Sequence, residues 1–203
     1  MTNDICRFVS LAITTVDTPA ATAGTTPAMT HVAAIGILIA ERDAEDRWQF
    51  SLRHHAVGAG EGEATLLAWA AHAMPATGIV IGWQLTESIV MPLLGAGRDV
   101  EPEIARLFLD RLTTLVTTPS VDLAIAHGGA AAPAFADVVA RYGIDLVPMS
   151  DTQIESAWAF GNIDVLRADV AQRATAAWRL WLAESNGAGA AALAAFETWI
   201  RRA

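Results

Sequence analysis

Asp169 is the acidic residue whose position in this sequence most suggests chemistry. It lies within GNIDVLRADVAQRATAAWRLWL, residues 161–182, a stretch otherwise dominated by Val, Leu, Ala and Trp that is typical of a helix. Helices seldom place an acid between residues such as Leu166 and Val170 unless it lies just outside the apolar stripe. Asp169 is therefore either an acid at the edge of that stripe or part of a site that needs negative oxygens, such as a divalent-ion site.

The histidines do not form a recognisable metal site. His54 and His55 are adjacent at the end of a predicted strand, so their side chains point to opposite faces and cannot chelate one ion together. His31, His72 and His127 have no partner at metal-ligand spacing. The sequence also lacks GxSxG, a P-loop and a GxGxxG after a strand, so the common hydrolase, phosphate-binding and dinucleotide signatures are missing.

Composition limits the classes of partner and compartment. Asp and Glu number 22 against 13 Lys and Arg, and the resulting formal charge of -9 disfavours nucleic acid without excluding a locally basic groove. Cys6 is the only cysteine, so an intrachain disulfide and a cysteine metal cage are excluded. The N-terminal sequence lacks a signal-peptide pattern, and no stretch has about 18 unbroken apolar residues. We expect a cytoplasmic protein that does not associate with a membrane.

The elements that would position Asp169 follow from apolar patterns and turn signals. An apolar content of 53% in 203 residues suffices for one core, so we predict a single domain spanning residues 1–203. The predicted strands are residues 5–16, 31–40, 47–56 and 78–85, with a loop over 17–30 and a short strand or extended segment over 121–126. The predicted helices are residues 61–75, 86–94, 101–116, 132–143, 153–161, 163–185 and 187–202. For the helix over 86–94 we expect Thr86 as the N-cap and Pro92 as a limit to its length. This order predicts an α/β fold with a mixed sheet and helices packed on it.

Residues 134–182, AFADVVARYGIDLVPMSDTQIESAWAFGNIDVLRADVAQRATAAWRLWL, resemble the C-terminal half of the PolB-like predicted 3'-to-5' exonucleases. This family belongs to the DnaQ-like, ribonuclease H-like superfamily. Its members have a helix that ends at a Gly, a short variable turn, a small helix, a G-x-I step and a helix bearing Y-x-x-x-D-V. The corresponding residues here are Val138, Val139, Gly143, Gly161, Ile163, Asp169 and Val170.

The N-terminal half resembles the same family more loosely. VSLAITTVDTP (residues 9–19) is similar to its first strand, F-D-I-E-T-V-P, and GEATLLAWAAHAM (62–74) to its first helix. IGWQLTESIVMPLL (81–94) is similar to G-[FY]-N-x-x-[FS]-D-x-P-x-L. The resemblance implies a ribonuclease H-like (DnaQ-like exonuclease) fold with a central mixed β-sheet flanked by helices.

Most of the family's polar site residues are replaced at the matching positions. The first-motif Asp and Glu fall on Ala12 and Thr14, and the second-motif Asn falls on Gln84. The second-motif Asp falls on Ile89, or on Val90 if Pro92 is held in register, and the third-motif Tyr falls on Val165. Only Asp169 matches.

The resemblance implies metal-dependent hydrolysis, which the replacement residues do not support. Enzymes of this kind use two divalent ions about 3.5–4 Å apart, held by several carboxylates, to hydrolyse a terminal phosphodiester. One aspartate cannot hold such a pair, because Mg²⁺ keeps its waters unless carboxylates or phosphates replace them. We therefore predict a degenerate exonuclease-like domain without an intact catalytic set and with no cofactor, retained for binding or assembly.

Two alternatives remain open. The first is an active exonuclease on single-stranded nucleic acid that uses Mg²⁺ or Mn²⁺ through substituted ligands, with Asp169 and Glu87 as candidates. The second is an interaction protein, in which Trp178, Trp181 and Trp199 form a homo-oligomer or partner surface.

Nucleic-acid binding without cleavage would use a groove formed by the arginines of two helices, although these arginines are also explained as part of a solvated face. These are Arg106, Arg111, Arg167, Arg173 and Arg179.

Overall fold

The computed structural model describes residues 6–18, 29–98, 100–185 and 189–202. Within these ranges five strands form one mixed sheet in the order β3-β2-β1-β4-β5. The first three strands pair antiparallel, and β4 and β5 run parallel to β1. The strands are β1 Cys6–Thr18, β2 Met29–Arg42, β3 Trp48–Ala56, β4 Ile79–Gly82 and β5 Ser120–Asp122. The predicted α/β fold with a mixed central sheet is confirmed.

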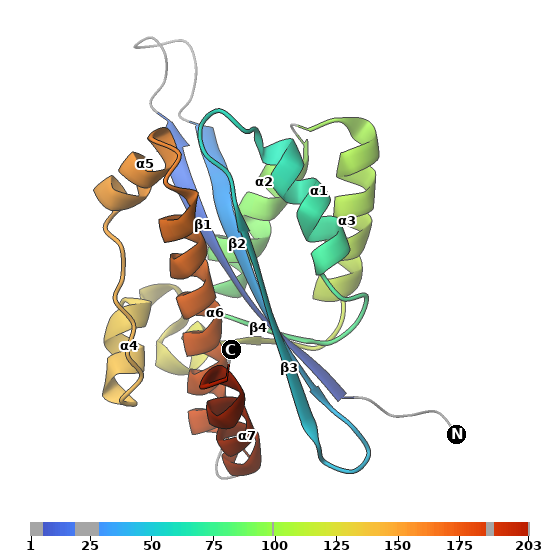
Figure 1. Ribbon diagram of the computed structural model, residues 1–203, viewed down its shortest axis with the longest axis vertical. Coiled ribbons are helices and arrows are strands. Elements are labelled where there is room, and N and C mark those ends of the chain that lie inside the picture. Colours follow the sequence, from blue (N-terminus) through green and yellow to red (C-terminus); the bar gives the residue numbers. More distant parts are fainter. Residues whose placement is uncertain (1–5, 19–28, 99, 186–188, 203) are drawn as a thin grey trace.

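Helices cover both faces of the sheet (Figure 1). On one face lie α1 Glu63–Ala73, α2 Met91–Arg98 and α3 Pro102–Val116. On the other lie α4 Phe135–Arg141, α5 Asp151–Ala159, α6 Ile163–Glu184 and α7 Ala190–Ile200. Among the described residues, no helix is both long and apolar enough to cross a membrane.

Strand β1 separates two hydrophobic cores because its side chains alternate between the faces of the sheet. Val9, Leu11 and Ile13 belong to the core under α1, α2 and α3. Phe8 and Ala12 belong to the core under α6 and α7. The position of Ala12 on the α6 side places it on the face where Asp169 also lies.

Helix α6 is held against β1 by two buried hydrogen bonds. Ser10 Oγ donates to the carbonyl oxygen of Ala174 at 2.7 Å, and Thr14 Oγ1 donates to Asp169 Oδ2 at 2.8 Å. These contacts join residues that are more than 150 positions apart in the sequence. They fix how far α6 is shifted along the strand, and with it the position of Asp169.

The tryptophans that suggested an oligomer surface pack within the chain. Trp178 is fully buried, and Trp181 and Trp199 are partly buried. The ring centroid of Trp181 lies 4.8 Å from that of Phe8, and the ring of Trp199 lies 5.7 Å from that of Phe50. They cover the sheet on the α6 side, so they do not supply the exposed aromatic anchors that the interaction-protein alternative required.

The arginines considered for a nucleic-acid groove do not share one surface. Helices α3 and α6 lie on opposite faces of the sheet (Figure 1). Arg106 on α3 and Arg167 and Arg179 on α6 also have carboxylates within 4.0 Å. A single basic groove built from both helices is therefore excluded.

The predicted loop over residues 17–30 is too long. Strand β1 continues through Thr18 and pairs with β2, which begins at Met29. Thr30 Oγ1 donates to Asp17 Oδ1 at 2.6 Å, which links the strands near this end. Local turn signals concealed this pairing, and residues 19–28 lie outside the described residues.

Two helical predictions also need correction. The segment predicted as a helix over 86–94 begins as a π-helical turn at Leu85–Val90, with Gln84 rather than Thr86 as N-cap, and continues as α2 to Arg98. Pro92 does not limit it, because the helix runs on through Pro92 to Arg98, and the turn before the proline is π-helical and not α-helical. The extended segment over 121–126 stops at β5 and gives way to a 3-10 turn, Leu123–His127, capped by the Asp122 carboxylate.

Candidate functional site

Strand β1 extends beyond the end of its neighbour β4, so part of its edge on that side has no paired strand. Strand β4 pairs with β1 only from Phe8 to Ser10, whereas β2 pairs with β1 to its end at Thr18. Backbone groups at such an edge need other partners. The carbonyl oxygen of Ile13 finds one in Nη1 of Arg173, at 3.0 Å. Space therefore remains beside β1, just beyond the end of a parallel strand, where open α/β sheets commonly bind ligands.

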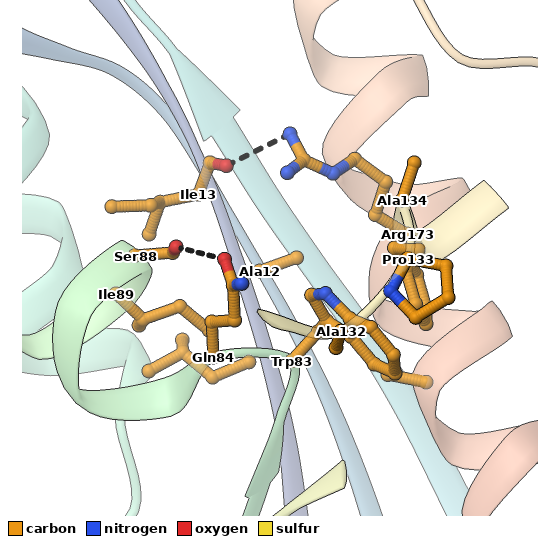
Figure 2. Close-up of a pocket in the computed structure, with 13 residues that line it drawn as sticks. Ala12, Ile13, Trp83, Gln84, Ser88, Ile89, Ala132, Pro133, Ala134 and Arg173 are labelled. Atoms are coloured by element: carbon orange, nitrogen blue, oxygen red, sulfur yellow. Dashed lines mark hydrogen bonds between the residues drawn. The ribbon is translucent and has the colours of Figure 1, made fainter. Parts of the chain in front are cut away.

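A cavity of about 270 Å³ occupies this place. Figure 2 shows Gln84, Ser88 and Ile89 on one side of it, and Trp83, Pro133 and Arg173 on the other. The remaining lining residues are Leu11, Ala12, Ile13, Ala132, Ala134, Phe135 and Ala177. The lining therefore combines an apolar surface with a few polar groups, as is typical of small-molecule sites.

Gln84 enters this cavity from an unusual backbone conformation. Its φ of 47° and ψ of 51° are left-handed, a region that residues with a side chain seldom adopt. The backbone N–H of the next residue, Leu85, donates to Asp122 Oδ2 at 2.9 Å, which helps to hold this turn. Gln84 Oε1 accepts a hydrogen bond from Ser88 Oγ at 3.0 Å. Among the described residues no acceptor pairs with its amide nitrogen, which can donate two N–H groups.

We expect Gln84→Gly to raise the free energy of unfolding by about 0.5–1 kcal/mol, because glycine adopts left-handed angles at little cost. Gln84→Ala removes the same amide but keeps a side chain at positive φ, so it should not stabilise the protein. Urea unfolding of the two variants and the wild type measures the difference. Equal stability of the glycine and alanine variants would show that the backbone at this position is unstrained.

Asp169 is a buried acid with two partners. It is 6% exposed, and its Oδ2 lies 2.8 Å from Thr14 Oγ1 and 3.4 Å from Arg173 Nη1. The same Arg173 nitrogen also lies 3.4 Å from Thr14 Oγ1. A guanidinium thus provides the positive charge beside this carboxylate.

Only some of the residues at the positions matched to the exonuclease motifs lie together in the structure. Ala12, Gln84 and Ile89 line the cavity, and Thr14 pairs with Asp169 nearby. Val165 lies outside it, in a separate hollow between α5 and α6. Val165 lies one turn before Asp169 on α6, but it lines this separate hollow and not the cavity.

Glu87 is exposed on the π-helical turn and does not line the cavity. It is therefore not placed to supply the displaced metal ligand that the active-enzyme alternative needs.

The residues present do not fit a pair of divalent ions. The lining of the cavity includes no carboxylate, and the nearby acid, Asp169, is already paired with Arg173. Mg²⁺ and Mn²⁺ need oxygen ligands, which Ala12 and Ile89 lack. In the described part of the chain, no three His, Cys, Asp or Glu side chains gather so as to hold a metal ion.

Aromatic side chains form one wall of the cavity and connect it to a polar cluster. The ring of Trp83 lies 5.2 Å from that of Phe135 and 5.6 Å from that of His127. His127 Nε2 lies 2.6 Å from Glu184 Oε1, which also accepts a hydrogen bond from Tyr142 at 3.2 Å. Partial burial and the Glu184 carboxylate raise the pKa of Tyr142. This cluster holds the turn after β5 against α6, and so supports the wall.

Sequence reasoning missed Trp83, Ser88 and Phe135 as lining residues, and it treated Arg173 as part of a basic face. Trp83 and Ser88 flank Gln84 in the segment that resembles the second motif, which was the one available signal for them. Phe135 and Arg173 come from segments far away in the sequence, and only the fold brings them to β1.

Comparison with known proteins adds no relative. No family model matches the sequence, and neither the search of curated proteins nor that of solved structures found a match.

Proposed function

We propose that this chain is a ribonuclease H-like domain of PolB-like exonuclease ancestry that no longer cleaves nucleic acid and serves in binding or assembly. The mixed sheet with helices on both faces supports the ancestry, as does the meeting of Ala12, Gln84 and Ile89 at one cavity. The function is inferred from the chemistry of that cavity.

The observation that carries the proposal is the contact between Arg173 and Asp169. The carboxylate matched to the family's surviving acid is buried and faces a guanidinium at 3.4 Å. A divalent ion seated beside this carboxylate would be repelled by the arginine, and it would find an alanine and an isoleucine where further oxygens are needed. The arginine thus neutralises an acid whose former role was to hold a cation.

We expect neither Mn²⁺ nor Mg²⁺ to raise the melting temperature. Binding at a metal concentration of one hundred times Kd would stabilise the folded state by about 2.7 kcal/mol, or roughly 5–11 °C in a chain of this size. Thermal unfolding with and without 5 mM metal chloride measures this. The control is Asp169→Asn, in which any ion bound at this carboxylate would lose its ligand.

The same preparations test cleavage. Incubation with 3'-labelled and 5'-labelled single-stranded DNA and RNA plus Mn²⁺ should leave every strand at full length. Shortening from the 3' end by the wild type, absent from Asp169→Asn, would contradict the proposal and favour the active-enzyme alternative.

A further inference from the structure

We propose that the cavity beside β1 binds a small organic monocarboxylate with a flat apolar body. This inference rests on the binding role proposed above and specifies its ligand. It follows from the hydrogen-bonding groups, the walls and the charge of the cavity.

The polar groups available to a ligand are mainly donors. The Ser88 hydroxyl engages the Gln84 amide oxygen, and no acceptor in the described part of the chain pairs with the amide nitrogen, whose two N–H groups can donate to a ligand. Arg173 uses Nη1 for Ile13, Thr14 and Asp169, and within the described residues its Nε and Nη2 have no protein acceptor. Figure 2 shows these two side chains approaching the cavity from opposite sides. A ligand that satisfies them must carry hydrogen-bond acceptors, and a carboxylate offers two oxygens.

The walls favour a flat apolar body attached to those acceptors. The rings of Trp83 and Pro133 line one side, and Ile89 and Ala12 line another part. The ring of Phe135, which also lines the cavity, lies 5.2 Å from that of Trp83. Aromatic faces attract a planar group by stacking and by burial of apolar area. The volume of about 270 Å³ is below the range of roughly 300–1,000 Å³ that is typical for drug-sized ligands, so a compact molecule fits.

The charge of the cavity favours one negative charge over two. Among the described residues, Arg173 is the only charged side chain that lines it. Its charge is shared with Asp169, whose Oδ2 lies 3.4 Å from Nη1. A phosphate dianion would gain one partly neutralised cation and would be repelled by that carboxylate, whereas a carboxylate monoanion is better balanced. A protein with a formal charge of -9 adds to this preference.

The backbone supplies an independent reason to regard Gln84 as a binding residue. Its left-handed conformation and the π-helical turn that follows it are both costly or rare, and both are enriched at functional sites. A glutamine at a position whose backbone suits glycine is explained if its amide contacts a ligand.

The test uses benzoate and 3-phenylpropanoate as probes, with benzamide as the neutral analogue of benzoate. Ligand-observed NMR and calorimetry should give a Kd of about 1 mM for the better carboxylate, as expected for a ligand of roughly ten heavy atoms. Benzamide should bind at least about fivefold more weakly. Equal binding of benzoate and benzamide, or no binding of either carboxylate at 10 mM, would overturn the inference. Displacement of benzoate by lower concentrations of inorganic phosphate or dAMP would overturn the preference for a monoanion.

Variants distinguish a ligand contact from a structural role of Gln84. Gln84→Gly should weaken benzoate binding at least about fivefold while its melting temperature rises, and Gln172→Ala, on the exposed face of α6, should leave binding unchanged. Unaltered affinity in Gln84→Gly, or equal loss in Gln172→Ala, would contradict the assigned contact. If neither carboxylate binds, the results expected from the metal and cleavage experiments do not change. The proposed ligand and the proposed loss of catalysis are therefore tested separately.

Discussion

Replacing Gly36 by alanine should lower the free energy of unfolding by about 3 kcal/mol, at the upper end of the usual range for overpacking. Gly36 lies on β2 directly under α6, and a Cβ atom at this position would come within 2.7 Å of the carbonyl carbon of Val170 and closer still to its oxygen. Both contacts are with backbone, so no side chain can rotate away to relieve them. The helix must move away from the sheet, and the apolar contacts between α6 and the sheet weaken with it.

Urea unfolding and thermal melting check this result. In a chain of this size, a loss of about 3 kcal/mol corresponds to a fall of roughly 6–12 °C in melting temperature. Gly95→Ala is the matched control, because Gly95 lies within α2 and a Cβ there has no neighbour within 4 Å. That variant should be more stable than the wild type by about 0.5–1 kcal/mol, since alanine favours helix more than glycine does. Loss of stability in both variants would show that the close approach of α6 to β2 is not the cause.

A displaced α6 would also change the site. Val170 follows Asp169 directly, so a helix pushed outward at Val170 carries the carboxylate away from Thr14. In Gly36→Ala we therefore expect weaker benzoate binding than in Gly95→Ala, because Arg173 lies on the same helix as Val170.

The parts of the fold that the sequence predicted are those with a strong local signal. The apolar pattern of α6 predicted a helix over 163–185, and the structure has Ile163–Glu184. The two segments predicted as strands over 31–40 and 47–56 form the antiparallel pair β2 and β3. Local patterns do not report cross-strand contacts, so the bond between Asp17 and Thr30 remained hidden and the loop there was predicted too long.

The site was predictable only where the resemblance aligned single positions. It pointed to Ala12, Gln84 and Ile89, which do share one cavity. It could not show that Arg173 reaches the carbonyl oxygen of Ile13, because 160 positions separate the two residues and no motif links them. Nor did it show that Val165 turns toward a different hollow, because that depends on how α5 packs beside α6.

Replacing Asp169 by alanine should lower the free energy of unfolding by about 2–3 kcal/mol. Thr14 is 1% exposed, and its hydroxyl would lose its acceptor; a buried donor without a partner costs about 1–3 kcal/mol. Arg173 would lose its counter-charge, but its side chain is 36% exposed, so water offsets part of that loss. Asp169→Asn keeps an oxygen for Thr14 and should cost about half as much.

The sign of this change separates a structural carboxylate from a metal ligand. Carboxylates that are held in place for function commonly lower the stability of the fold. If Asp169 served to bind a cation, the metal-free Asp169→Ala variant would be as stable as the metal-free wild type, or more stable. Denaturant unfolding of Asp169→Ala in the presence of EDTA therefore distinguishes the two roles. Asp164→Ala on the same helix is the control, because the Asp164 side chain is 87% exposed, and its ion pair with Arg167 and its place in the first turn should contribute less than about 1 kcal/mol. A wild-type protein that was no more stable than Asp169→Ala would mean that the contact with Arg173 and Thr14 does not stabilise the fold, which would contradict the proposal that Arg173 stands in place of a cation.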